Sequence, residues 1–123
     1  MSLTIELVEA GSLSKDALAL TIAAIHEEAT AAAIKAENEY KAKYGEPGYC
    51  GFAWVNLHGI RSNSKVGKEV AKFARKDYTN TFAIWNPGKT ATQSMDVKEC
   101  GAWAYAAVWK AHGFKAYSGS RAD

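Results

Sequence analysis

Residues 49–57 have the sequence YCGFAWVNL, which predicts the central β-strand of the fold. Aromatic and β-branched side chains dominate the segment, as is typical of strands. Gly51 interrupts it and indicates a bulge or a close approach of another backbone. Gly45, Pro47 and Gly48 precede the strand and end the element before it.

The preceding element is predicted to be a long helix over residues 15–44. This segment contains no glycine or proline and is rich in Ala, Glu and Lys, and Ser14 can cap it. Its small and apolar positions follow heptad-like steps of four and three: Leu18, Ile22, Ile25, Ala29, Ala32 and Ala36. We expect this seam to pack on a second copy of the chain, with Ile34 and Tyr40 turned toward the sheet. The alternative is a helix whose packing contacts all lie within the monomer, with its Ala-rich side exposed.

Four further segments complete the predicted fold. The alternating residues 3–8 and the short segments 81–85 and 114–118 predict strands, and residues 65–76 predict a second helix. A capping box of Asp96 and Glu99 predicts the start of a third helix. We expect its inner stripe to leave Trp103, Tyr105 and Trp109 aside and to consist of Val97, Cys100, Gly101, Ala104, Ala107, Val108 and Ala111.

The predicted order is β-α-β-α-β-α-β, within one domain over residues 1–123. Three helices against a four-stranded sheet indicate an α/β (α+β) fold, a two-layer sandwich with a mixed sheet. The N-terminal residues lack the features of a signal peptide, and no apolar run approaches the roughly 20 residues of a membrane-spanning helix.

The two cysteines, Cys50 and Cys100, indicate buried free thiols in a reducing cytosol rather than a disulfide framework. Together with His58 they match no zinc-binding spacing, so no metal and no cofactor is predicted. His26 is expected at the surface of the long helix, beside Glu27 and Glu28.

A basic block is the strongest functional pattern. Residues 61–89 carry seven cations and two acids, whereas residues 1–48 carry four cations and eight acids, within a chain of net charge +2. We call six of these cations the basic set and expect them to form one exposed face that is not internally paired: Arg61, Lys65, Lys68, Lys72, Arg75 and Lys76. Such a face can bind nucleic-acid phosphates without reading sequence. The alternative is an ordinary solvated helix surface.

The aromatic residues give weaker support for nucleic-acid binding. Exposed rings can stack the bases of single strands, although large aromatics more often supply core area. The candidates are Trp54, Tyr78, Phe82, Trp85, Trp103, Tyr105, Trp109 and Tyr117. A second possible site is an anion or nucleotide pocket near the start of the third helix, formed by Arg61, Lys89, Gln93, Ser94 and Arg121.

Two blocks of the chain carry a family resemblance. Residues 49–56 (YCGFAWVN) form one, and residues 93–102 (QSMDVKECGA) form the other, which continues through Gly113 and residues 116–117 to residues 120–123 (SRAD). Together they resemble small uncharacterised proteins of tailed bacteriophages and prophages, over roughly the last 75 residues. The resemblance implies a phage origin and expression in the bacterial host cytoplasm, and it implies no activity.

These observations favour a phage accessory protein whose basic helix binds either nucleic acid or an enzyme of the host that processes nucleic acid. The alternatives are an oligomeric protein that binds a small anionic ligand such as a nucleotide, as a sponge or an enzyme, and a structural virion component. The sequence contains no catalytic signature, so the protein is not predicted to be an enzyme. A homo-oligomer through the long helix is expected, and a membrane partner is not.

Overall fold

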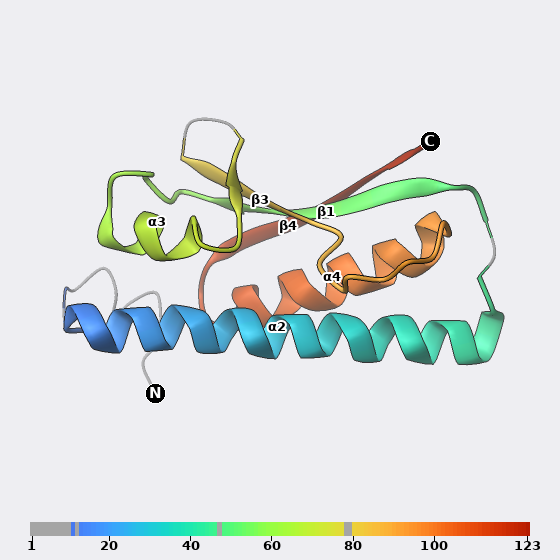
Figure 1. Cartoon of the computed structure of the whole chain (residues 1–123), viewed down its shortest axis with the longest axis horizontal. Helices are drawn as coiled ribbons and strands as arrows, with labels where there is room; N and C mark the ends of the chain where they lie inside the picture. Colours follow the sequence, from blue (N-terminus) through green and yellow to red (C-terminus); the bar gives the residue numbers. More distant parts are fainter. Residues whose placement is uncertain (1–10, 12, 47, 78–79) are drawn as a thin grey trace.

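The computed structural model describes residues 11, 13–46, 48–77 and 80–123. The described elements, in chain order, are α2 (Lys15–Tyr44), β1 (Gly51–His58), α3 (Lys65–Val70), β2 (Arg75–Lys76), β3 (Thr81–Trp85), α4 (Met95–Ala111) and β4 (Lys115–Ala122). The fold belongs to the mixed α/β class, with three helices and a four-stranded sheet (Figure 1). The strand predicted at residues 3–8 lies outside the described residues.

The sheet has the order β2-β3-β1-β4, with β1 in the middle as its sequence predicts. All three pairings of the described strands are antiparallel, so the parallel pair expected of a mixed sheet does not occur among them. β3 and β4 flank β1 and run in the same direction, and α4 connects them. The crossover through α4 therefore passes over β1 and places the helix against the inner face of the sheet.

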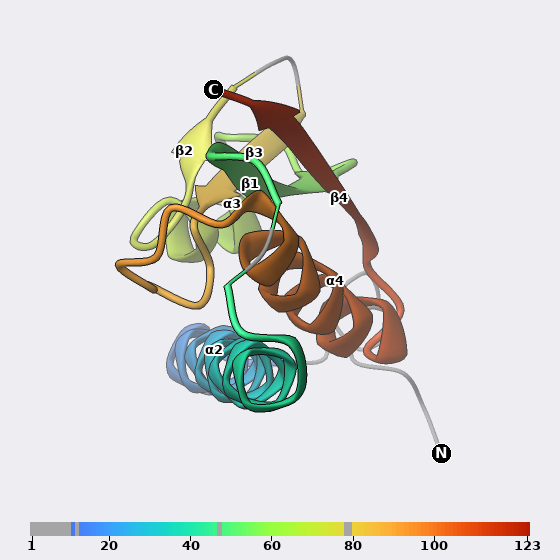
Figure 2. The ribbon, with the colours of Figure 1, turned by 90° about the vertical axis from the view of Figure 1, so that its right-hand side faces the viewer.

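The three helices lie on the same side of the sheet (Figure 1). α4 packs on β1 and β4, and α2 packs along α4 and also contacts α3. Viewed along α2, α4 stands between that helix and the sheet (Figure 2). Helix α2 spans 30 residues, about 45 Å, and Ser14 caps it by accepting the N–H of Ala17 at 3.2 Å.

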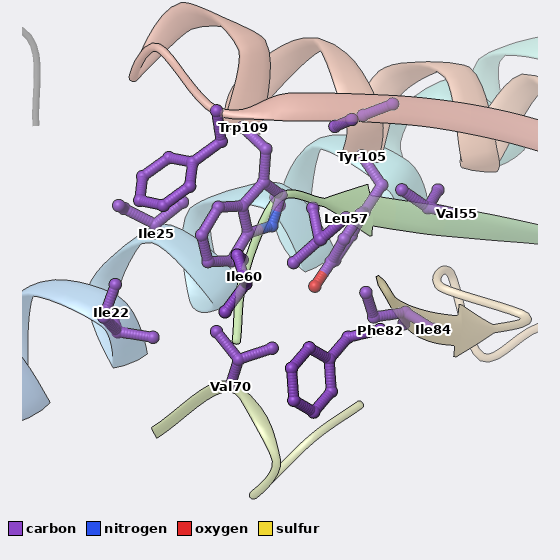
Figure 3. Close-up of a cluster of buried hydrophobic side chains, with 14 of the residues drawn as sticks. Ile22, Ile25, Val55, Leu57, Ile60, Val70, Phe82, Ile84, Tyr105 and Trp109 are labelled. Carbon is purple, nitrogen blue, oxygen red and sulfur yellow. The ribbon is translucent and has the colours of Figure 1, made fainter. Parts of the chain in front are cut away.

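The core lies between the helices and the inner face of the sheet (Figure 3). Tyr105 and Trp109 of α4 are fully buried there, against Val55 and Leu57 of β1. The predicted inner stripe of α4 is right at Val97 and Gly101, which are buried, and wrong at Ala107 and Ala111, which are exposed. Burying two large aromatic rings removes much more apolar area from water than burying alanines, so the helix turns its aromatic side inward.

Three local predictions about caps, helix length and cysteine burial are also wrong. Ser94, not Asp96, caps α4, and its Oγ accepts the N–H of Val97 at 3.4 Å. Helix α3 ends at Val70, because the chain turns at residues 71–74 and enters the edge strand β2. Cys50 is exposed rather than buried, whereas Cys100 is half-buried, and both are free.

The seam predicted on α2 packs inside the monomer. Leu18, Ile22, Ile25 and Ala29 are all buried in the core, and Ala33 continues the stripe. A second copy therefore cannot use that seam without opening the domain. By length and composition alone, α2 is the one helix of the described chain apolar enough to cross a membrane, but this buried stripe lies against the rest of the domain.

His26, which was expected at the surface, is half-buried at the junction of three elements. Its ring stacks on Phe73 with centroids 4.0 Å apart, and its Nδ1 lies 2.8 Å from the hydroxyl of Tyr105. Burial lowers the pKa of His26, and Lys89 acts in the same direction against Glu27. The histidine therefore joins α2, α4 and the turn after α3, as a structural contact.

Candidate functional site

The six residues of the basic set are all exposed, as predicted. Lys72 is the exception to the expectation that they are unpaired, because its Nζ lies 2.7 Å from Oε1 of Glu69. Exposed pairs of this kind contribute little to stability, typically about 0–1 kcal/mol. The charge of Lys72 is nevertheless partly balanced locally, which weakens its attraction for an anion.

The basic set does not form one face. Lys65 borders a hollow with Leu13 and Leu18, at the start of α2, and Lys72 borders another beside His26. Arg75, in contrast, belongs to the edge strand β2, where it lies opposite Ala83 of β3. The early end of α3 separates these cations, so the single helical face predicted from their spacing is wrong.

The residues of the alternative anion pocket are also separated. Arg61 follows the end of β1, whereas Arg121 pairs with Phe52 at the beginning of that strand, and the stretch of β1 from Phe52 to His58 alone spans about 20 Å. Ser94 is buried and its hydroxyl already caps α4. Gln93 and Ser94 line the same shallow hollow of about 550 Å³, together with Lys41 and Glu46. The five residues therefore do not converge on one ligand.

A different surface gathers ring-bearing side chains from several strands. The outward positions of β1 are Phe52, Trp54, Asn56 and His58, which alternate with the buried residues of the strand. Pairing places Trp85 of β3 beside Trp54, and Tyr117 of β4 beside Asn56. We call the outward side of the sheet the open face, and its five rings the aromatic platform: Phe52, Trp54, His58, Trp85 and Tyr117.

None of the described helices covers the open face, because α2, α3 and α4 all lie on the other side (Figure 1), although Thr81 and Ala83 of β3, which also point outward, are buried. Trp85 is 49% exposed and Tyr117 is 54% exposed. Large aromatic side chains normally contribute to a core, and here the core has its own buried aromatics. An exposed aromatic surface of this kind is typical of a binding site.

The platform consists of rings in mutual contact. The Trp54 and Trp85 rings lie 4.8 Å apart with an interplanar angle of 36°, and Phe52 meets Trp85 edge-on at 6.4 Å. His58 and Tyr117 form a second edge-on pair at 5.3 Å. Trp54 lies directly over Gly119 of β4, where a Cβ atom would approach the indole to 2.7 Å. The absence of a side chain at Gly119 lets this indole lie close to the sheet.

Cations surround the platform. Arg75 of β2, with Lys115 and Arg121 of β4, occupies outward positions at the two edges of the sheet. No outward position within the four strands holds an acid, whereas the next outward positions beyond β2 and β4 hold Asp77 and Asp123. The Arg121 guanidinium lies 5.5 Å from the centre of the Phe52 ring, and Lys110 Nζ lies 5.3 Å from that of Tyr117. These are cation–π distances, and such cations can bind phosphate near a stacked base.

Polar groups occupy the middle of the open face. The Nδ1 atom of His58 lies 3.4 Å from the Thr81 hydroxyl. The Oδ1 atom of Asn56 is shielded from solvent and has no hydrogen-bond partner among the described residues. Asn56 therefore separates the Trp54–Trp85 pair from the His58–Tyr117 pair with a side chain that cannot stack.

Only part of this site was predicted. Trp54, Trp85 and Tyr117 were considered as candidates for base stacking, whereas Phe52 and Lys115 were not. The even-numbered spacing of Phe52, Trp54 and His58 was the pattern from which their shared face could have been predicted, because residues an even number apart on a strand lie on the same face. The meeting of three strands depends on their pairing register, which the chain does not reveal locally.

A buried carboxylate lies on the helical side of the molecule. Glu37 of α2 is 2% exposed and is wedged between Gly88 and Gly101, where a side chain at either glycine would overlap its carboxylate. Burial raises the pKa of Glu37 to about 7, against the opposing effect of Lys41 and Lys98. Lys98 is itself buried and donates to the Gly51 carbonyl at 2.8 Å. Lys98 therefore links α4 to the beginning of β1, close enough to Glu37 of α2 to act on its charge.

The described residues contain no group of three or more His, Cys, Asp or Glu side chains placed to hold a metal ion. No family model matches the chain, and no curated protein or solved structure shows significant similarity to it. The functional interpretation therefore depends on the open face itself.

Proposed function

We propose that the protein binds single-stranded nucleic acid on the open face of its sheet. The observation that supports this most directly is the aromatic platform, which lies exposed among cations and has no acid among the outward strand positions. Bases of a single strand stack on such rings whatever their identity, and flanking Arg and Lys neutralise the phosphates. A duplex offers only its base edges and backbone, so the platform favours unpaired strands.

The cations on this surface favour a nucleic acid over a protein partner or a second copy of the chain. A protein partner or a second copy of the chain would cover the rings with apolar side chains, and the cations at both edges would then need acids opposite them. A single strand provides bases for the rings and phosphates for Arg75, Lys115 and Arg121. Within this proposal, the remaining cations of the basic set attract the polyanion from a distance.

The test compares two exposed tryptophans. Trp85 belongs to the platform, whereas Trp103, which is 63% exposed on α4, does not. We expect Trp85→Ala to weaken binding of a mixed-sequence 12-residue oligonucleotide, as DNA or RNA, by about 5- to 150-fold, since a stacked base contributes about 1–3 kcal/mol. Trp103→Ala should bind like the wild type. Fluorescence anisotropy at low and high salt measures both.

The controls separate stacking from charge. Reversal of Lys65 and Lys68 to Glu should reduce affinity at low salt and little at high salt, because these cations act through screened electrostatics. Trp85→Ala should be deficient at both. The proposal is wrong if the wild type binds no single strand, if it prefers a duplex, or if Trp103→Ala is as deficient as Trp85→Ala.

A further inference from the structure

The aromatic platform is divided into two parts. The first subsite consists of Trp85 with Phe52 and Trp54, whose rings each contact that of Trp85, and the second consists of His58 and Tyr117. Asn56 lies between the two and contributes no ring, whereas the surface over Gly119 is covered by the Trp54 indole of the first subsite. A base can therefore stack within either subsite, and not on Asn56.

The separation of the subsites follows from the pairing register. Trp85 is level with Trp54, and Tyr117 is level with Asn56, which is one two-residue step farther along β1. Trp85 and Tyr117 also stand on the two strands that flank β1, so two strand spacings lie between them. With about 3.3 Å per residue and about 4.8 Å between strands, their Cα atoms are about 12 Å apart.

Each subsite has a cation of its own. Arg121 lies over Phe52 in the first, at 5.5 Å, and Lys110 lies over Tyr117 in the second, at 5.3 Å. The same combination of a stacking ring and an adjacent cation therefore occurs twice on one face. Such a combination suits one nucleotide, with the base on the ring and the phosphate at the cation.

We infer that the open face has two base-binding subsites, and that its minimal ligand is a single-stranded segment of two to three nucleotides. This inference rests on the proposed function and makes it more specific. Sheets that bind RNA through exposed aromatics stack two or three bases, which agrees with the spacing of these rings. Longer strands add only electrostatic contacts at the edges of the sheet.

The experiment is a length series followed by removal of single bases. Oligodeoxyadenylates of one to eight nucleotides are titrated into the full-length protein, and binding is measured by calorimetry. We expect the affinity to rise steeply up to three nucleotides and only gradually beyond. Trimers in which one position is abasic are then titrated into the wild type, Trp85→Ala, Tyr117→Ala and the control Trp103→Ala.

The expected pattern links each ring to one base. In the wild type, removal of a base from either stacked position should weaken binding about 5- to 150-fold. In Trp85→Ala, removal of the base from one of these positions should have no further effect, while the other position still matters. In Tyr117→Ala the two positions should exchange roles, and Trp103→Ala should behave like the wild type.

The outcomes are distinguishable. If no oligonucleotide of any length binds, the proposed function is wrong and the two subsites fall with it. Two outcomes overturn only the two-subsite inference, provided that long strands bind in a Trp85-dependent way. In the first, affinity rises evenly with each added nucleotide. In the second, removal of the base at the same position has no effect on binding in both Trp85→Ala and Tyr117→Ala. A break at three nucleotides with separate positional effects supports it.

Discussion

The buried carboxylate of Glu37 predicts a specific dependence of stability on pH. Folding raises the pKa of this group from its ordinary 4.5 to about 7, because burial disfavours the charged form. The folded protein therefore holds a proton that the unfolded chain releases between these two values. The free energy of unfolding should fall as pH rises through this window and level off above about 7. At about 1.4 kcal/mol per pH unit, the full effect is about 3 kcal/mol.

The perturbation is Glu37→Gln, which keeps the shape of the side chain and removes its titration. Urea unfolding followed by tryptophan fluorescence at pH 4.5, 6, 7 and 8 gives the free energy for each protein. We expect the difference between wild type and variant to shift by up to about 3 kcal/mol between pH 4.5 and 8, with the variant gaining as pH rises. His26, whose lowered pKa has the opposite effect on stability, titrates in both proteins and cancels in the difference.

The matched control is Glu39→Gln on the same helix. Glu39 is exposed and forms a 3.9 Å pair with Lys35, so its effect should stay within about 0.5 kcal/mol at every pH. A difference between wild type and Glu37→Gln that is independent of pH would refute the reasoning, since it would mean that Glu37 is ionised in the folded protein at a normal pKa. A slope of the opposite sign would mean that Lys98 and Lys41 outweigh burial.

Two further predictions concern other surfaces. The outward stripe of α2 includes Leu20, which is 73% exposed, and Ile34, and we propose that a second copy of the chain packs on it. Light scattering at high micromolar concentration should give the mass of a dimer for the wild type and of a monomer for Leu20→Glu. A monomeric wild type would contradict this proposal. Gly119→Ala should lift Trp54 from the sheet, lowering the unfolding free energy by about 1–3 kcal/mol in urea melts and weakening oligonucleotide binding, whereas Ser120→Ala should change neither. Unchanged Trp54 emission and stability in Gly119→Ala would show that the indole has room to move.

The elements of the fold could be predicted because their patterns are local. Helix α2 spans Lys15–Tyr44 in the sequence prediction and in the structure, since residues 15–44 lack glycine and proline and have a cap at Ser14. The central position of β1 also followed from its composition. Each of these features depends on residues adjacent in the chain, so no knowledge of tertiary packing was needed.

The faces of the helices could not be predicted in the same way. Alanine occurs on every side of α2 and α4, so apolar periodicity does not determine which side is buried. The orientation of α4 depends on the burial of Tyr105 and Trp109, and that of α2 depends on its fit against α4. Both are tertiary effects. They bury Tyr105 and Trp109, which were predicted off the inner stripe of α4, and they bury the seam of α2 that was predicted to pack on a second copy.

The candidate site was predicted in its chemistry and not in its position. Cations and aromatic rings were both expected to bind nucleic acid, but they were assigned mainly to a helix that ends at Val70. The site forms only when antiparallel pairing brings Trp85 and Tyr117 to either side of β1. Sequence separation between these strands is large, and their order is set by the crossover through α4.

The arrangement of the molecule suggests how its two charged surfaces would act together under the proposed function. Helix α3, which carries Lys65 and Lys68, lies on the helical side of the sheet (Figure 1), whereas the platform lies on the other side, so we expect these two cations to act through a long-range attraction that salt screens. Arg75, Lys115 and Arg121 border the rings and contact the strand after it arrives. The basic helix would therefore raise the rate of association, and the open face would determine how long a strand remains bound. Because the two effects belong to different elements, substitutions on α3 should change mainly the association rate, and substitutions on the sheet should change mainly the dissociation rate.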